Sequence, residues 1–200
     1  MKPKNFYAVI LTMFLLFNCK NENKKENTDN TQTTTKINVL NNTVNTLNNA
    51  ENLLETTPIS FEALDAWFPK TLLDMQLKSV EKGSLSANGI TSMVGHYRGP
   101  NDKSLDLLIN DAAGKNGSIV VGSFSIYKNM KVDKEDDYKL EKSFKNGKLG
   151  GIETYHKRAK ECMISGMYQD RFAIVISSKK LERETVWDAI DTFNFNNLTK

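Results

Sequence analysis

Cysteine and histidine are scarce in this chain of 200 residues, which contains only two of each. They are Cys19, Cys162, His96 and His156. Small disulfide-stabilised domains use several cysteine pairs, and a structural zinc site uses four closely spaced Cys or His ligands. The sequence contains no Cys-x-x-Cys or His-x-His spacing. It therefore excludes a disulfide-rich scaffold and carries no zinc motif.

An excess of charge of one sign is also lacking. The chain has 27 Lys and Arg against 24 Asp and Glu, a net charge of +3. Lys2 and Lys4 precede Cys19 in a segment without acidic residues, so the chain from Cys19 onward carries 25 basic and 24 acidic residues. A charge this small gives no general attraction to nucleic acid or to an anionic membrane. We therefore expect no nucleic acid partner.

A hydrophobic run long enough to cross a membrane is the third absence. The apolar run over residues 6–17 has 12 residues and is broken only by Thr12. A membrane-spanning helix needs about 20 apolar residues. A short apolar run after a positively charged start is typical of an export signal. The sequence therefore predicts a lipoprotein signal peptide over residues 1–18.

The end of this run identifies the type of signal. Leu16-Phe17-Asn18-Cys19 resembles the lipobox of bacterial lipoproteins, with Asn18 departing from the usual small residue before the cysteine. The resemblance implies that Cys19 is the lipid attachment residue and the first residue of the mature chain, which contacts the membrane through its lipid. Lys20 follows instead of the Asp that retains lipoproteins in the inner membrane. By that analogy the predicted location is the bacterial cell envelope, with the outer membrane favoured and the periplasmic or surface face left open.

Two weakly structured segments are predicted after Cys19. Residues 19–36 are rich in Asn, Lys, Glu and Thr, and too few are apolar to offset the entropy cost of folding, so a disordered tether is expected. Residues 37–57 form a predicted weak helix or linker, because Ile37, Leu40 and Val44 fall on one helical stripe. The stripe fits a stalk helix that pairs with a partner, or a helix that packs loosely on its own domain.

Residues 58–200 are predicted to form one α+β globular domain. Short alternating segments separated by turn residues predict strands, and the Asn146-Gly147 pair predicts a hairpin. The expected strands are 75–81, 90–98, 104–110, 138–144, 149–156, 161–169 and 172–177; the expected helices are 61–67, capped by Ser60, and 181–193. Residues 118–130 fit either a strand or a helix. The prediction is an antiparallel sheet of about six or seven strands covered by helices, with a C-terminal helix.

Short motifs in this domain resemble a family of uncharacterised bacterial lipoproteins. They include Trp67-Phe68-Pro69, Leu72-Leu73-Asp74-Met75 and Asp170-Arg171-Phe172, and the resemblance covers residues 58–198. That family has no assigned activity. The layout is also similar to PsbP/Mog1-like domains, whose members mostly bind other proteins. The family resemblance supports the domain limits and adds no mechanism, and the PsbP/Mog1-like layout is an analogy of fold from which function does not follow.

The residues that could carry chemistry are few. Cys162 and His156 lie near predicted strand ends and could form a nucleophile–base pair, which would make the chain an enzyme with an unrecognised site. His96 could join His156 in a metal site only if their strands were neighbours. A small buried cysteine in a sheet explains Cys162 equally simply. We therefore predict no catalytic residue, metal or cofactor.

Paired polar residues at strand ends have a local explanation. Asn101-Asp102 and Asn110-Asp111 fit turns, and the acidic run over residues 133–137 fits a solvated loop. Asp170-Arg171 also fits a turn, or a surface ion pair at a binding edge. The sequence thus predicts a membrane-anchored, non-catalytic binding or accessory module with an unknown envelope protein partner. A carrier of lipid or of small molecules is a further alternative, and it would need an apolar cavity between sheet and helix.

Overall fold

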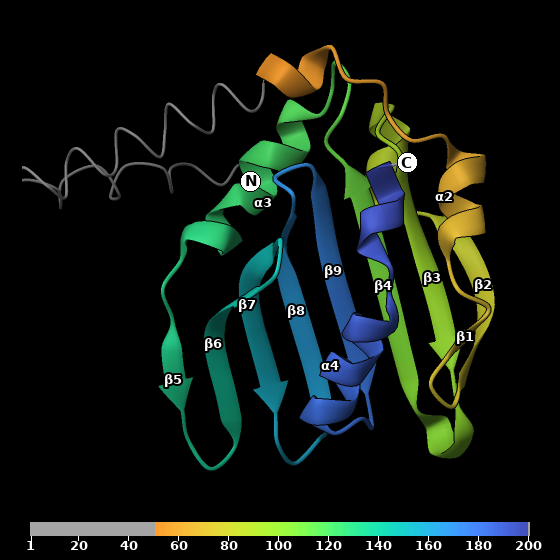
Figure 1. Ribbon diagram of the computed structural model, residues 1–200. Coiled ribbons are helices and arrows are strands. Elements are labelled where there is room, and N and C mark those ends of the chain that lie inside the picture. Colours follow the sequence, from red (N-terminus) through yellow and green to blue (C-terminus); the bar gives the residue numbers. More distant parts are fainter. Residues whose placement is uncertain (1–50, 200) are drawn as a thin grey trace, which may run out of the picture. The chain divides into compact units, whose positions relative to one another are not determined.

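The computed structural model describes residues 51–199, and the predictions for the signal, for Cys19, for the tether and for residues 37–50 lie outside this range. The described chain forms one antiparallel sheet with helices, as the α+β prediction states (Figure 1). The strands are β1 (Thr71–Leu72), β2 (Met75–Lys82), β3 (Ser92–Arg98), β4 (Ser104–Asp111), β5 (Asp133–Glu135), β6 (Lys139–Asn146), β7 (Leu149–His156), β8 (Glu161–Tyr168) and β9 (Phe172–Lys179). The helices are α2 (Phe61–Trp67), α3 (Ser118–Asn129) and α4 (Arg183–Thr192), with 3₁₀ turns at Ser84–Asn88, Pro100–Asp102 and Phe195–Thr199. Residues 51–54, within the predicted helix or linker of residues 37–57, are helical as well.

The sheet has nine strands, so the prediction of six or seven strands is wrong. Their order is β1-β2-β3-β4-β9-β8-β7-β6-β5. The uncounted strands, β1 and β5, are two and three residues long and form the two edges. Segments this short carry too little alternation to be recognised in a sequence. The order also divides the sheet into two meanders, β1–β4 and β5–β9, which meet where β4 pairs with β9.

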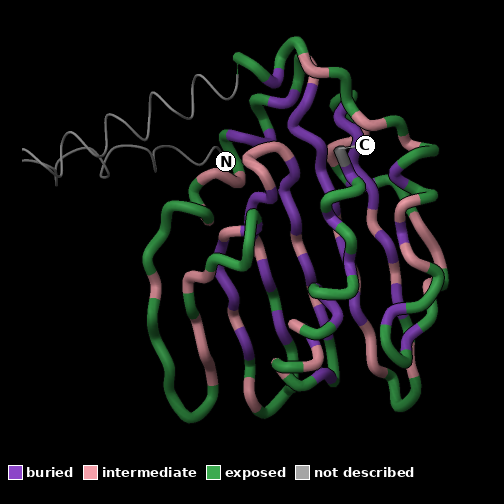
Figure 2. Tube along the Cα trace, viewed as in Figure 1, coloured by how far each residue is buried: buried purple, intermediate pink, exposed green. Residues whose placement is uncertain are grey.

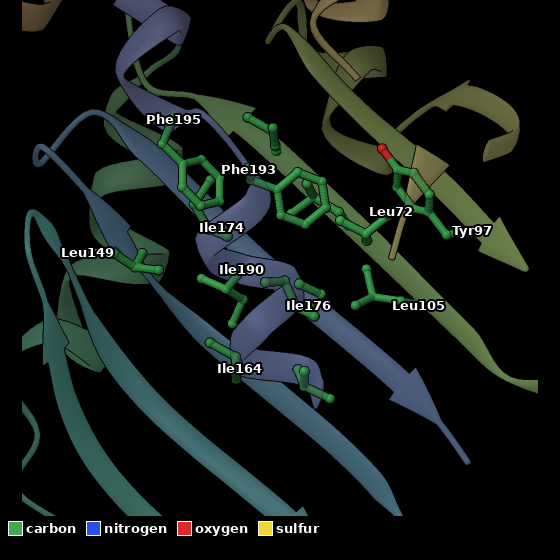
Figure 3. Close-up of a cluster of buried hydrophobic side chains, with 14 of the residues drawn as sticks. Leu72, Tyr97, Leu105, Leu149, Ile164, Ile174, Ile176, Ile190, Phe193 and Phe195 are labelled. Atoms are coloured by element: carbon green, nitrogen blue, oxygen red, sulfur yellow. The ribbon is translucent and has the colours of Figure 1, made fainter. Parts of the chain in front are cut away.

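Helices cover both faces of this sheet. Val186, Ala189 and Ile190 of α4 are buried in the same cluster as Ile164 and other residues of the central strands (Figure 3). α2 contributes Leu64 to that cluster. α3 lies on the opposite face, where a second cluster contains its two buried valines together with residues of β8 and β9: Val120, Val121, Met167 and Ala173. The most deeply buried strands are therefore the central ones, between the two helical layers (Figure 2).

α3 resolves the ambiguity over residues 118–130. Val120 and Val121 are buried, whereas Ser118, Ile119 and Gly122 are exposed. In a strand, neighbouring side chains point to opposite faces, so two adjacent buried residues between exposed ones fit a helical face. The valines have weak helix propensity, and burial against the sheet overrides it here.

Several predicted elements agree with the structure. Ser60 caps α2, its Oγ accepting a hydrogen bond from the Ala63 N–H at 3.1 Å. Leu105, Leu107 and Ile109 of β4 are fully buried on one face. The Asn146-Gly147 signal marks the β6–β7 hairpin, although Asn146 pairs with Leu149 and the two loop residues are therefore Gly147 and Lys148. Gly147 takes a φ of 58°, which glycine adopts without steric cost.

Both ends of the domain differ from the prediction. α4 covers Arg183–Thr192, shorter than the predicted 181–193, and the chain then enters the 3₁₀ turn at Phe195–Thr199. At the other end Leu53 is buried, and its carbonyl accepts a hydrogen bond from the Gly114 N–H at 2.8 Å. The packed domain therefore begins before residue 58, the predicted boundary. Among residues 51–199, no helix is long and apolar enough to cross a bilayer.

A buried ion pair joins segments that are far apart in the sequence. The Asp111 carboxylate at the end of β4 is fully buried and lies against the Arg171 guanidinium, whose Nε and Nη2 donate to it at 2.8 and 2.7 Å. The same carboxylate accepts the Ile59 and Ala113 N–H groups at 2.8 and 3.0 Å. Arg171 also donates to the Thr57 carbonyl at 3.1 Å. The Asn110-Asp111 and Asp170-Arg171 pairs, predicted as separate turn features, thus meet through Asp111 and Arg171.

We expect replacement of Asp111 by alanine to lower the free energy of unfolding by about 3–5 kcal/mol, because the Arg171 charge would remain beside the core without its partner. The measurement is urea denaturation followed by circular dichroism. Asp74→Ala is the matched control, since Asp74 pairs with Lys103 at 2.8 Å on the surface and its loss should cost at most about 1 kcal/mol. Equal losses for the two variants would contradict a larger stabilising role for the buried Asp111–Arg171 pair than for a surface ion pair.

Strands β7 and β8 approach each other closely at a pair of glycines. Gly151 and Gly166 are register partners, and a Cβ on Gly151 would lie 2.1 Å from the Ser165 carbonyl oxygen. The neighbouring Gly150 differs, because its Cβ would meet no atom closer than 3.6 Å. Gly151 is thus required by backbone contact and Gly150 is not.

Gly151→Ala should therefore destabilise the domain by about 2 kcal/mol or more, the effect of forcing atoms into a packed interior. Gly150→Ala should change stability by less than about 1 kcal/mol. Urea midpoints of the two variants, measured side by side, test this. A Gly151→Ala protein as stable as Gly150→Ala would show that the strands separate without cost.

Candidate functional site

The structure does not bring the predicted nucleophile and base together. Cys162 pairs in register with Tyr155, and both are buried on the α4 face. His156 follows Tyr155 in β7, so its side chain points to the opposite face, where it is exposed. The sheet itself therefore separates the Cys162 thiol from the His156 imidazole.

His96 lies far from both residues. It belongs to β3, which is separated from β7 by β4, β9 and β8. Its Nδ1 lies 2.8 Å from Asp106 Oδ1, which also accepts Arg98 Nη1 at 2.6 Å. Ser79 is the register partner of His96, but its hydroxyl donates to Glu81 at 3.4 Å. Within residues 51–199, no group of three or more His, Cys, Asp or Glu side chains is placed to hold a metal ion.

A buried carboxylate under α4 was not predicted. Glu153 of β7 is 1% exposed. It accepts hydrogen bonds from Arg183 Nη2 at 2.7 Å and from Trp187 Nε1 at 3.0 Å, both on α4. The Cys162 Sγ lies 3.9 Å from the same carboxylate. Both carboxylate oxygens are thus engaged, and the group fixes α4 to the sheet. The signal in the sequence was a lone Glu at an inward position of a strand, which normally requires a partner.

The environment of Cys162 disfavours the reactive thiolate form of its side chain. Burial raises the pKa of this thiol to about 12, and the nearby Glu153 carboxylate acts in the same direction. Arg183 opposes the shift, but more weakly than burial. Since the thiolate is the nucleophile, a thiol that remains protonated at neutral pH is a poor one. Cys162 therefore fits the packing role that the sequence offered as its simpler explanation.

The remaining polar candidates are structural or exposed. Asp102 lies in a 3₁₀ turn at a positive φ of 57° and pairs with Lys180 at 2.8 Å. Residues 133–137 are all exposed, as predicted, although 133–135 form the edge strand β5 and not a loop. Arg171 is only 18% exposed, so the surface ion pair considered for Asp170-Arg171 is wrong for Arg171.

A groove of about 440 Å³ lies between α2 and the chain that follows α4. These two segments sit side by side near the C-terminus (Figure 1). The groove is lined by Ile59, Ala63, Ala66, Trp67, Pro69, Thr192, Asn194 and Asn197. None of these side chains is charged, and the single hydroxyl, on Thr192, donates to the Asp188 carbonyl at 2.9 Å. The lining therefore offers binding contacts and no acid, base or activated nucleophile.

Trp67 forms the aromatic wall of this groove. Its indole N–H donates to the Asn194 carbonyl at 3.1 Å, which joins α2 to the C-terminal segment. The ring stacks on Phe193 and on Phe195 with centroid separations of 5.8 and 5.6 Å. The two phenylalanine centroids are 5.8 Å apart, so the three rings form a nearly equilateral triangle. Phe68 also packs edge-on against the indole at a centroid separation of 5.4 Å, and the half-buried Trp67 lines the groove with the part of its ring that these three phenylalanines leave uncovered.

A second groove, of about 320 Å³, lies on the other side of the same aromatic cluster. It is lined by Phe193 and Phe195 together with the β6–β7 turn, and it contains the charged residues Lys148 and Asp191. Tyr168 at its wall donates from its hydroxyl to Asn196 Oδ1 at 2.7 Å. The two grooves therefore differ in charge, and only the first is neutral.

We expect the Cys162 thiol to resist Ellman's reagent in the folded protein. With a pKa of about 12, the thiolate fraction at pH 8 is about one in ten thousand, whereas an ordinary cysteine is partly ionised at that pH. The full chain carrying Cys19→Ser leaves Cys162 as the only thiol, and it should react with one equivalent only after unfolding in guanidinium. Ala87→Cys, at an exposed site, is the positive control. Rapid labelling of native Cys162 would reopen the catalytic interpretation.

Comparisons with known proteins give no further identification. The chain matches no protein-family model, no curated protein and no solved structure. The family resemblance drawn from the sequence motifs stays a prediction.

Proposed function

We propose that this chain is a lipoprotein of the bacterial cell envelope, held to the membrane through lipidated Cys19, whose globular domain is a non-catalytic binding module. The short apolar run and the Leu16–Cys19 pattern support the anchor. The polar segment that follows supports a tether between membrane and domain. Lys20 supports the outer membrane as its location.

The neutral groove beside Trp67 is the observation that carries the binding role. Its volume of about 440 Å³ falls within the usual range for small-ligand sites. It combines an aromatic wall with the polar side chains of Thr192, Asn194 and Asn197, the mixture typical of such sites. Because no titratable side chain lines it, the groove favours recognition over catalysis. Its ligand would be a component of the envelope in which the anchor places the domain.

Two alternative functions receive less support. An enzyme site around His156 and Cys162 would need the two groups on one face, and they lie on opposite faces of the sheet. A lipid carrier would need an apolar cavity between α4 and the sheet, yet Ile164, Ile174 and Ile190 pack together there (Figure 3). Binding at the surface groove avoids both difficulties.

The anchor is tested by the intact mass of the protein extracted from membranes. Wild type should begin at Cys19 and carry the added mass of its lipid chains, because several chains are needed for lasting attachment at about 0.8 kcal/mol per buried CH₂. Cys19→Ser should lose that mass and leave the membrane fraction or remain uncleaved. Cys162→Ser is the matched control and should keep the lipid.

A wild-type protein without lipid would overturn the proposed anchor. In that case the protein would be found in a soluble fraction with residue 19 as a free thiol or removed. Fractionation on a density gradient separates inner from outer membranes. Recovery with the inner membrane would contradict the location proposed from Lys20.

A further inference from the structure

We propose that the neutral groove between α2 and the C-terminal segment binds an uncharged saccharide, with one sugar ring stacked on Trp67. This inference deepens the proposed binding function and depends on it. Three properties of the groove favour this ligand: the presentation of the indole, the chemistry of the polar side chains, and the absence of charge from its lining.

The indole of Trp67 can offer only its ring surface to a ligand. Its N–H is already bonded to the Asn194 carbonyl at 3.1 Å. Phe193 and Phe195 stack on the ring and Phe68 packs edge-on against it, and all three phenylalanines are buried, so the ring is held in place while its uncovered part lines the groove. An aromatic surface without a free donor suits the C–H face of a pyranose ring, which contacts it by dispersion and by its weakly positive hydrogens.

Polar side chains that can bind sugar hydroxyls line the same groove as the Trp67 ring. Asn194 and Asn197 each carry a side-chain amide with two donors and one acceptor, and both residues are exposed. The Thr192 hydroxyl donates its proton to the Asp188 carbonyl, so its oxygen can only accept a hydrogen bond from a ligand. Side chains that both donate and accept match sugar hydroxyls, which also do both.

The amide-bearing segment is held in place before any ligand binds. The Asn197 N–H donates to the Asn194 carbonyl at 3.0 Å within the C-terminal turn. Phe195 and Leu198, in the same turn, are buried in the main core. The backbone that carries these amides is therefore fixed before binding, so the ligand has to order only their side-chain torsions, which favours affinity.

The absence of charge narrows the ligand class. All eight lining residues are neutral, so the groove has no side chain to neutralise a phosphate, a carboxylate or an amine. A proline-rich peptide is the other ligand that an aromatic groove could hold. The carbonyl groups of such a peptide only accept hydrogen bonds, so the Thr192 oxygen and the amide oxygens of Asn194 and Asn197 would lack partners, whereas saccharide hydroxyls use both the donors and the acceptors of the lining. The geometry therefore favours the saccharide.

Titration calorimetry on the full lipidated chain tests the proposal. The chain is kept in a detergent without a sugar headgroup, and the probes are β-1,4-linked trimers of glucose and of N-acetylglucosamine. At least one trimer should bind saturably. Binding should persist at about 1 M salt, where charge interactions are screened beyond about 3 Å. Tryptophan fluorescence should change with the same midpoint.

Ala66→Leu fills the groove from an exposed position of α2 and should weaken binding about tenfold or more. Ala87→Leu makes the same change at an exposed site that does not line the groove, and it should bind as wild type does. Asn194→Ala should weaken binding as well, since it removes an amide and leaves the backbone contact to Trp67. Matching circular dichroism spectra establish that all variants are folded.

Three outcomes would overturn the proposal. The first is no binding of either trimer at about 10 mM. The second is binding that Ala66→Leu leaves unchanged. The third is binding of an oligoproline peptide, sensitive to Ala66→Leu, in the absence of trimer binding; this would reject the saccharide while keeping the groove as a binding site. The mass measurement on Cys19 is independent of all three, so failure of the anchor and failure of the ligand class are distinguishable.

Discussion

The Asp111 carboxylate is the contact on which the arrangement of this domain depends. It is fully buried, and four N–H donors surround it: two from Arg171 and one each from Ile59 and Ala113. A buried charge is tolerated only when it is paired and hydrogen-bonded throughout, as this one is. Through it the strand end of β4, the turn between β8 and β9, and the chain leading into α2 are fixed together. The groove beside Trp67 depends on that position of α2.

Local patterns in the sequence were sufficient to predict most of the helices and strands. Ser60 before an amphipathic turn, the alternation of Leu105 to Ile109, and the glycine after Asn146 each depend on neighbours a few residues away. Such signals can be evaluated without knowing the tertiary structure. The edge strands and α3 were missed or left open, because two or three residues carry no period and because the valines of α3 satisfy both patterns until the sheet buries them.

The site was less accessible to prediction for a related reason. Asp111 and Arg171 are 60 residues apart, and Trp67 meets the Asn194 carbonyl across 127 residues. No spacing rule connects residues at these distances. The sequence drew attention to cysteine and histidine because they are chemically versatile, but the groove is made of alanine, asparagine and tryptophan. These residues indicate a binding site only after the fold brings them to one place. Conversely, Cys162 and His156 stopped being a candidate catalytic pair once the structure placed them on opposite faces of the sheet.

The order of the strands has a consequence for how the chain reaches this structure. Each of the two meanders is built from neighbours in the sequence, so each can assemble through short loops. Only the β4–β9 pairing joins distant parts, because Asp111 lies opposite Phe172 and residue 104 opposite residue 179. Closing that long loop is the step with the greatest entropic cost, and folding rates fall as such non-local pairing increases. During folding, the two meanders therefore pair much as two separate protein partners associate, and the β4–β9 ladder is their interface.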